Sequence, residues 1–260
     1  LEALDGSVDV DALDLPGVDA IVHLASRTNP RLGTLQDEVA QLADLSRILE
    51  RIERGPHTAF VFCSSGGTVY RDSEEPHAED DALAPRGDHA WAKVAAEELI
   101  RSRGRANGLL YKIVRAANPY GPHQSVHGGQ GLIAKLLHDL RREETTEIWG
   151  DGGAVRDYLY VADLCRLLEA MLRQPEVSGV FNAGSGVGTS VLDVVGRIED
   201  AVGTRPRLRH MPAPAGAVRH NVLLVERVQD AFAWTPTTSL TEGIAATWGW
   251  LARQPCTSST

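Results

Sequence analysis

The sequence has few cysteines and no long hydrophobic run, and each shortage excludes a class of protein. Three cysteines, Cys63, Cys165 and Cys256, match no zinc-site spacing and cannot all pair, which favours a reducing compartment over a disulfide scaffold. The longest apolar runs are only as long as a strand, and no signal peptide is visible, so no membrane span is expected. The sequence therefore predicts a soluble, cytoplasmic protein.

Concentrated positive charge is also lacking. The net charge is -9 at pH 7, and the basic run at 101–108 is interpreted as the exposed end of a helix with its cap. Without a basic face to meet phosphate chains, nucleic acid is not an expected partner. The length of 260 residues and the 43% hydrophobic content allow one large domain, or a main domain with a smaller one.

Short apolar runs that alternate with amphipathic segments indicate the fold class. Strands are expected at 19–26, 58–65, 109–117, 147–150 and 179–184, and helices at 34–54, 89–103, 131–142, 161–174 and 190–203. Strands that are apolar on both faces and alternate with helices predict an α/β fold with a doubly wound parallel, Rossmann-like sheet. We expect residues 1–117 to form this core, incomplete at its N-terminus, and residues 118–260 to form mainly a smaller substrate-binding lobe interleaved with it.

Seven phrases follow one another in a fixed order. They are HLAS at 23–26, SSGGTVY at 64–70, HAWAK at 89–93, NPYGPHQ at 118–124, WGDGGAVRDYLYV at 149–161, FNAGSG at 181–186 and WTPTTSLTEGI at 234–244. Together they resemble the NAD-dependent epimerase/dehydratase family, the extended short-chain dehydrogenases that act on nucleotide sugars, and in particular its UDP-glucose 4-epimerase-like branch. The resemblance covers essentially the whole chain. It implies NAD as cofactor and a nucleoside-diphosphate (NDP) sugar as substrate.

The phrases RDYLYV and NPYG supply candidate ligands for a diphosphate. Arg156 follows a glycine-rich loop, where a guanidinium can hold a diphosphate through two hydrogen bonds. A structural network between Arg156 and Asp157 is the alternative. In the resembled family this arginine and the asparagine of NPYG, here Asn118, contact the diphosphate of the sugar nucleotide. Arg219 is a weaker second candidate, because a lone arginine in a loop is usually only solvated.

SSGGTVY follows a buried strand, so its hydroxyls are expected at the carboxyl end of that strand, where open α/β sheets bind ligands. The resembled family has a catalytic serine or threonine four residues before the tyrosine, a position that is Gly66 here. Thr68 is the first candidate to replace it, followed by Ser65 and Ser64. Alternatively, these hydroxyls only cap the turn after the strand.

Three departures from the family bear on NAD. No G-x-x-G-x-x-G turn precedes HLAS, whose Ala25 is implied to contact the cofactor, and Ser7 stands where an aspartate would contact the adenine. The tyrosine of Y-x-x-x-K is His89, although Lys93, the implied ligand of the nicotinamide ribose, is present. A histidine has a suitable pKa for a base, near 6.5, but its ring nitrogen stops about 2 Å short of a phenol oxygen. His89 could also be a polar helix-start residue without a chemical role.

Two functions remain open. The first is an NDP-sugar epimerase or dehydratase that works through transient oxidation by NAD, with His89, Lys93, Thr68 and Ser65 at the reaction. The second is a cofactor-free descendant, either a non-redox isomerase or cyclase or an NDP-sugar-binding pseudoenzyme, that keeps only Asn118 and Arg156. In either case, the resemblance implies a homodimer built through the helices at 34–54 and 89–103.

The chain begins at Leu1, without a methionine. In a doubly wound sheet the strand at 19–26 would have a neighbour on each side, and an apolar edge left open would promote aggregation. We expect about 50 to 60 residues, the size of two βα units, to precede Leu1. A rearranged N-terminal segment or a partner chain could cover the edge instead.

Overall fold

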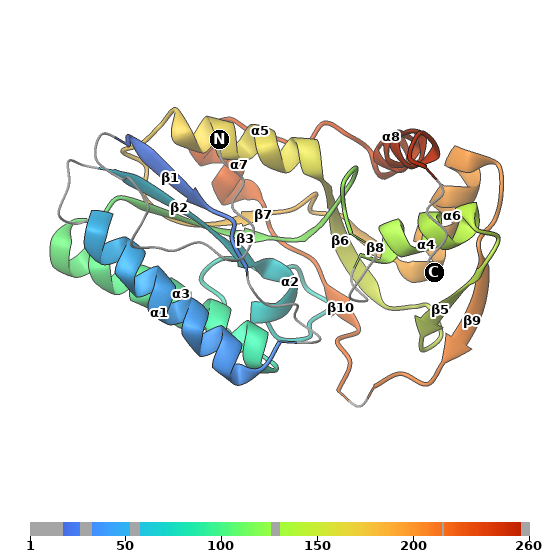
Figure 1. Ribbon diagram of the computed structural model, residues 1–260, viewed down its shortest axis with the longest axis horizontal. Coiled ribbons are helices and arrows are strands. Elements are labelled where there is room, and N and C mark those ends of the chain that lie inside the picture. The colour runs from blue at the N-terminus through green and yellow to red at the C-terminus, as the bar shows by residue number, and fades with distance from the viewer. Residues whose placement is uncertain (1–17, 27–32, 53–57, 126–130, 215, 256–260) are drawn as a thin grey trace.

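The structure is a computed structural model that describes residues 18–26, 33–52, 58–125, 131–214 and 216–255. Its larger sheet is parallel, in the order β1-β2-β3-β7, with strands Ala20–His23, Ala59–Ser65, Tyr111–Ala116 and Gly179–Ala183. Helices α1 (Leu35–Ile52) and α3 (Asp88–Asn107) cover one face of this sheet, and α5 (Val161–Leu172) and α7 (Glu226–Phe232) cover the other (Figure 1). The predicted α/β fold with a parallel sheet is confirmed.

Two apolar layers hold these helices on the sheet. Phe60 and Ile113 face α1 and α3 together with Leu49 and Ile100, and all four side chains are fully buried. On the other face, Val61 and Val114 pack with residues of α5 and α7. The strands are apolar on both sides because both sides are buried.

The second group of strands begins where the first sheet ends. Only Ala117 separates β3 from β4 (Asn118–Tyr120), which pairs with β6 (Val155–Tyr160) in a sheet of order β10-β6-β4. Strand β10 is His220–Asn221, β8 (Gly188–Ser190) pairs antiparallel with β6, and β5 (Thr145–Trp149) pairs with β9 (Arg207–Met211). Helices α4 (Leu132–Arg141), α6 (Val191–Val202) and α8 (Leu240–Ala252) surround these strands (Figure 1). The division at residue 117 stays a prediction.

Local sequence explains where several helices begin and end. Ser190 and Asp193 form a capping box at the start of α6, and Ser239 with Glu242 forms one at the start of α8. Gly203 ends α6 in the left-handed conformation, with φ of 79°. Among the helices of the described segments, none is long and apolar enough to cross a membrane.

Some elements lie where no pattern predicted them. Helices α2 (Gly66–Val69), α7 and α8, and strands β4, β6, β8, β9 and β10, are additional to the expected elements. In the described part of the chain, β1 pairs on one side only, with β2. What covers its other edge stays a prediction, because residues 1–17, including Ser7, lie outside the described residues, as does Cys256.

Candidate active site

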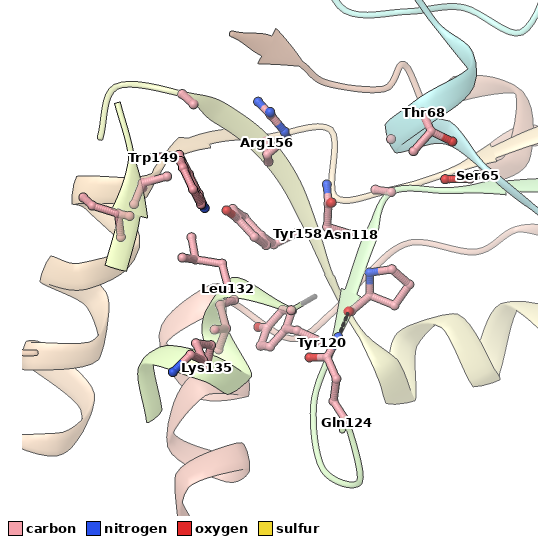
Figure 2. Close-up of a pocket in the computed structure, with 18 of the residues that line it drawn as sticks. Ser65, Thr68, Asn118, Tyr120, Gln124, Leu132, Lys135, Trp149, Arg156 and Tyr158 are labelled. Carbon is pink, nitrogen blue, oxygen red and sulfur yellow. Dashed lines mark hydrogen bonds between the residues drawn. The ribbon is translucent and has the colours of Figure 1, made fainter. Parts of the chain in front are cut away.

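A cavity of about 590 Å³ lies where the larger sheet meets the second group of strands. Its walls come from the end of β2, α2, the first turn of α3, β4, α4, β5 and β6. Figure 2 shows Ser65 and Thr68 on one side, Trp149 and Tyr158 on the other, and Asn118 between them. The carboxyl end of a parallel strand is where open α/β sheets bind ligands.

Two hydroxyl groups reach this cavity from the SSGGTVY segment. Ser65, the last residue of β2, and Thr68, in α2, both line the wall. The Oγ1 atom of Thr68 is buried and has no hydrogen-bond partner among the described residues. An unpaired buried hydroxyl costs about 1–3 kcal/mol, so it gains from bonding a ligand oxygen. Ser64 instead donates to Glu97 Oε1 at 2.6 Å, inside the protein core.

His89 lines the same cavity from the first turn of α3. Its Nδ1 atom lies 3.1 Å from Oε1 of Glu38, in the first turn of α1. Burial lowers the pKa of His89, and the Glu38 carboxylate partly opposes this effect, so the ring is neutral near pH 7. A neutral imidazole can accept a proton, which is what a general base requires.

Lys93 and Ala25 lie together, but in a smaller cavity beside the first one. The Nζ atom of Lys93 donates to the carbonyl oxygen of Cys63 at 3.1 Å and lies 5.0 Å from the centre of the Phe62 ring. Burial lowers the pKa of this ammonium. Because the group keeps further donors beside an exposed Ala25, these residues fit the nicotinamide ribose end of NAD.

Asn118 and Arg156 line the larger cavity from paired strands, β4 and β6. Asn118 Nδ2 donates to the carbonyl oxygen of Asp157 at 2.8 Å, which fixes the amide. Arg156 donates to the carbonyl oxygens of Val155 and Val218, at 2.8 Å each, and within the described ranges no carboxylate pairs with it. A half-buried guanidinium without an anion is suited to hold an anionic ligand.

The alternative network between Arg156 and Asp157 is not formed. The buried Asp157 carboxylate accepts hydrogen bonds from Ser185 N and Oγ, at 2.8 and 2.7 Å, and from Gly186 N at 3.1 Å. It therefore holds the FNAGSG loop against β6. Burial raises the pKa of Asp157, and these hydrogen bonds oppose the shift.

Arg219, the weaker phosphate candidate, lies outside the cavity wall. Its Nη2 atom pairs with Asp151 Oδ2 at 3.3 Å, and both side chains are mostly exposed. Its backbone N–H donates to Asp72, and its carbonyl oxygen lies 3.4 Å from Arg156 Nη1. The Arg219 side chain can reach a ligand only by leaving Asp151.

Several cavity residues were not recognised in the sequence. Trp149 and Tyr158 stand in the quoted WGDGG and RDYLYV phrases but received no role, although Trp149 is 47% exposed on the cavity wall. The place of Trp149 directly before a glycine-rich loop could have indicated that it lines the site. Glu38 gave no indication, because an acidic residue in the first turn of a helix is common.

The chain is similar in sequence to curated proteins named as nucleotide-sugar enzymes. The chain is 31% identical over 252 residues to a UDP-glucose 4-epimerase of Mycolicibacterium smegmatis, covering 92% of this chain and 80% of that protein. It is 27% identical over 241 residues to a dTDP-glucose 4,6-dehydratase of Streptomyces griseus, covering 91% and 72%. Both relatives are named for reactions on nucleotide sugars.

Solved structures give the same result. A Thermus thermophilus UDP-glucose 4-epimerase in complex with NAD superposes with a TM-score of 0.82 at 26% identity, covering 91% of this chain and 78% of that one. A Thermotoga maritima UDP-glucose 4-epimerase with UDP-glucose gives 0.79 at 28%, covering 90% and 77%. A family model matches residues 4–184, and the chain belongs to the NAD dependent epimerase/dehydratase family.

Proposed function

We propose that this protein is an NDP-sugar epimerase or dehydratase that works through transient, NAD-dependent oxidation of the sugar. The observation that carries the proposal is that one cavity holds both a guanidinium that pairs with no carboxylate of the described residues, on Arg156, and an imidazole, on His89, with Thr68 and Ser65 beside it. The first suits a diphosphate and the others suit a sugar hydroxyl. The relatives named as UDP-glucose 4-epimerases and dTDP-glucose dehydratases support this substrate class.

The diphosphate is held from β4 and β6. Arg156 keeps its position through carbonyl oxygens and has donors left for phosphate oxygens, and Asn118 supplies an amide N–H. Arg219 can add a second positive charge when it leaves Asp151, a pair that is weak because both side chains are exposed. Trp149 and Tyr158 add apolar surface on the same side of the cavity.

The sugar is handled at the opposite side. His89 accepts the proton of a ring hydroxyl, either directly or through one water, and Thr68 Oγ1 or Ser65 donates a hydrogen bond to a sugar oxygen. Lys93 and Ala25 hold the nicotinamide ribose, and Lys93 also disfavours the protonated form of His89. NAD, when bound, would be the group that accepts a hydride from the sugar and later gives it back.

A homodimer through α1 and α3 is part of the proposal. Leu35 and Val39 on α1 are each 49% exposed, and Trp91 on α3 is 48% exposed. The two helices pack against each other on one face of the sheet (Figure 1), so these apolar side chains are available for a second copy.

Calorimetric titration with UDP-glucose, dTDP-glucose and NAD tests the function. Arg156→Ala is expected to weaken UDP-sugar binding by about 10- to 100-fold, because a hydrogen bond to a charged group contributes about 1.5–3 kcal/mol. Arg156→Lys keeps the positive charge and tests whether the two parallel N–H groups of the guanidinium are needed. The control is Arg205→Ala, which changes an exposed arginine paired with Glu199. Absence of NDP-sugar binding would overturn the proposal, and binding without any affinity for NAD would favour the cofactor-free alternative.

A further inference from the structure

The contact between Glu38 and His89 joins the two cavities. Glu38 lines the smaller cavity with Ala25 and Lys93, and His89 lines the larger one with Thr68 and Ser65. Glu38 Oε1 lies 3.1 Å from His89 Nδ1, and the two side chains are only 5% and 14% exposed. The pair therefore stands between the residues assigned to the cofactor and those assigned to the sugar.

Glu38 lies in the first turn of α1 and has a hydrogen-bond partner besides His89. Thr34 and Asp37 cap the start of α1 by reciprocal hydrogen bonds, and Glu38 follows in the first helical turn. The N-terminal end of a helix stabilises negative charge. Gln41 Nε2 also donates to Glu38 Oε2 at 3.3 Å. A carboxylate buried to this degree requires such partners, and His89 is among them.

The contact with the Glu38 carboxylate determines which ring nitrogen of His89 carries the proton. The carboxylate can only accept, so Nδ1 must donate to it, and Nε2 is left with a lone pair. The charged groups that act on the ring are Glu38 on α1 and Lys93 on α3. From α2 and β4, the uncharged Thr68 and Asn118 face the cavity.

We propose that Glu38 is a positioning residue that orients His89 and makes its Nε2 atom the general base of the reaction. The inference rests on the proposed function, which identifies the proton donor as a hydroxyl group of the sugar. The sugar hydroxyl gives its proton to Nε2, and the electron pair of the O–H bond stays on the oxygen. Nδ1 keeps its proton, and the carboxylate of Glu38 balances the new charge on the ring. On the return step Nε2 gives the proton back.

The carboxylate of Glu38 also opposes the effect of Lys93 on His89. In the resembled family, the lysine is needed to lower the pKa of a tyrosine, whereas a histidine needs support of the opposite sign. Burial and Lys93 both weaken His89 as a base, and Glu38 strengthens it. Glu38 therefore adjusts the pKa of the base in this protein, as the lysine does in the resembled family, but with the opposite sign.

The first test needs no turnover. In ¹⁵N NMR of the intact protein, the His89 ring, assigned by its loss in His89→Gln, is expected to carry its proton on Nδ1 when neutral. Glu38→Gln is expected to lower the pH at which His89 titrates or to move the proton to Nε2, while the other histidine resonances stay unchanged. An unchanged tautomer and titration in Glu38→Gln would overturn the inference.

The second test uses UDP-glucose with NAD. Glu38→Gln is expected to lower kcat by on the order of 10- to 100-fold with little change in KM, since positioned acid–base groups contribute at least this much. The acidic limb of the kcat profile is expected to move to lower pH, a change that damage to the fold would not cause. Glu50→Gln, the same charge change at an exposed site of α1, is the control. A Glu38→Gln enzyme with the wild-type pH profile would refute the role.

The two proposals fail separately. If His89 shows the expected tautomer but the wild-type protein binds no NDP-sugar, the proposed function is wrong and the pairing stands. If NDP-sugars are converted and Glu38→Gln is unchanged, the function stands and Glu38 has no part in it.

Discussion

The side chain of Leu223 occupies the space that a β-carbon on Gly66 would need. An ideal Cβ at residue 66 would lie 2.6 Å from Leu223 Cδ1 and 2.9 Å from the carbonyl oxygen of Arg115. The resembled family has a serine or threonine at this position. In this protein even a β-carbon at this place would be crowded, which agrees with the proposal that Ser65 or Thr68 supplies the hydroxyl.

Gly66→Ala is expected to lower the free energy of unfolding by about 1–3 kcal/mol, because the added methyl overpacks the site against a backbone oxygen. Gly67→Ala is the matched control, since its nearest contact would be 3.6 Å, to Asn118 Oδ1. Urea denaturation of the two variants measures the difference. Equal stability of both would contradict the packing around Leu223.

The fold could be read from the sequence to the extent that burial leaves a pattern. The strands of the larger sheet are apolar on both faces, and the long helices carry apolar stripes, so both were predicted. The short strands β8 and β10 were not, because two or three residues are too few for a period to be seen. Helix α8 was missed although Ser239 and Glu242 form its capping box.

A buried ion pair between Arg115 and Glu97 ties β3 to α3. Arg115 Nη2 lies 2.6 Å from Glu97 Oε2, and both side chains are 1% exposed. Arg115→Met is expected to cost about 3–5 kcal/mol, because it removes the buried cationic partner of the Glu97 carboxylate and leaves it, among the described residues, only the hydrogen bond from Ser64 and a longer contact, 3.3 Å, with Arg101. The double variant with Glu97→Gln is expected to recover part of this loss.

The exposed pair of Glu169, on α5, and Arg173, the residue directly after this helix, is the comparison for that measurement. Arg173→Met is expected to change the free energy of unfolding by less than about 1 kcal/mol. Chemical denaturation of the variants provides both values. A similar loss in the free energy of unfolding at the two sites would show that the buried pair stabilises the protein no more than the exposed one.

His23 makes stability depend on pH. Burial, and next Lys93, lower the pKa of this histidine to about 4, so the unfolded chain binds a proton more readily than the folded protein does. The stabilisation is complete above the unfolded pKa and is lost as pH falls towards the folded pKa. From about pH 7.5 to about pH 5, wild type should lose about 2 kcal/mol more than His23→Leu. Parallel losses, measured by urea denaturation at each pH, would show that His23 is not the group responsible.

The dimer can be tested through the exposed apolar residues of α1 and α3. Val39→Glu together with Trp91→Glu is expected to reduce the mass measured by light scattering from about twice 28.1 kDa to that of one chain. Leu172→Glu changes an exposed leucine on α5 and should leave the mass unchanged. A monomeric wild type, or a dimer that survives both substitutions, would exclude this interface.

The site was predictable only where a motif named its residues. Asn118, Arg156, Thr68, Ser65 and His89 come from quoted phrases, and all five line one cavity. The pairing of His89 with Glu38 joins residues 51 positions apart, and the pairing of Arg219 with Asp151 joins residues 68 positions apart. Such contacts depend on how helices and loops pack, which no local pattern records.

A single residue, Ala117, connects β3 to β4. Ala117 leaves no linker, so the chain that ends the larger sheet immediately begins the strand bearing Asn118. Strand β4 in turn pairs with β6, the strand that carries Arg156, so a short stretch of backbone connects the larger sheet to the wall that bears both side chains. A short backbone connection limits how far these two walls can move apart, so we expect an NDP-sugar to bind more tightly than a sugar carrying a single phosphate.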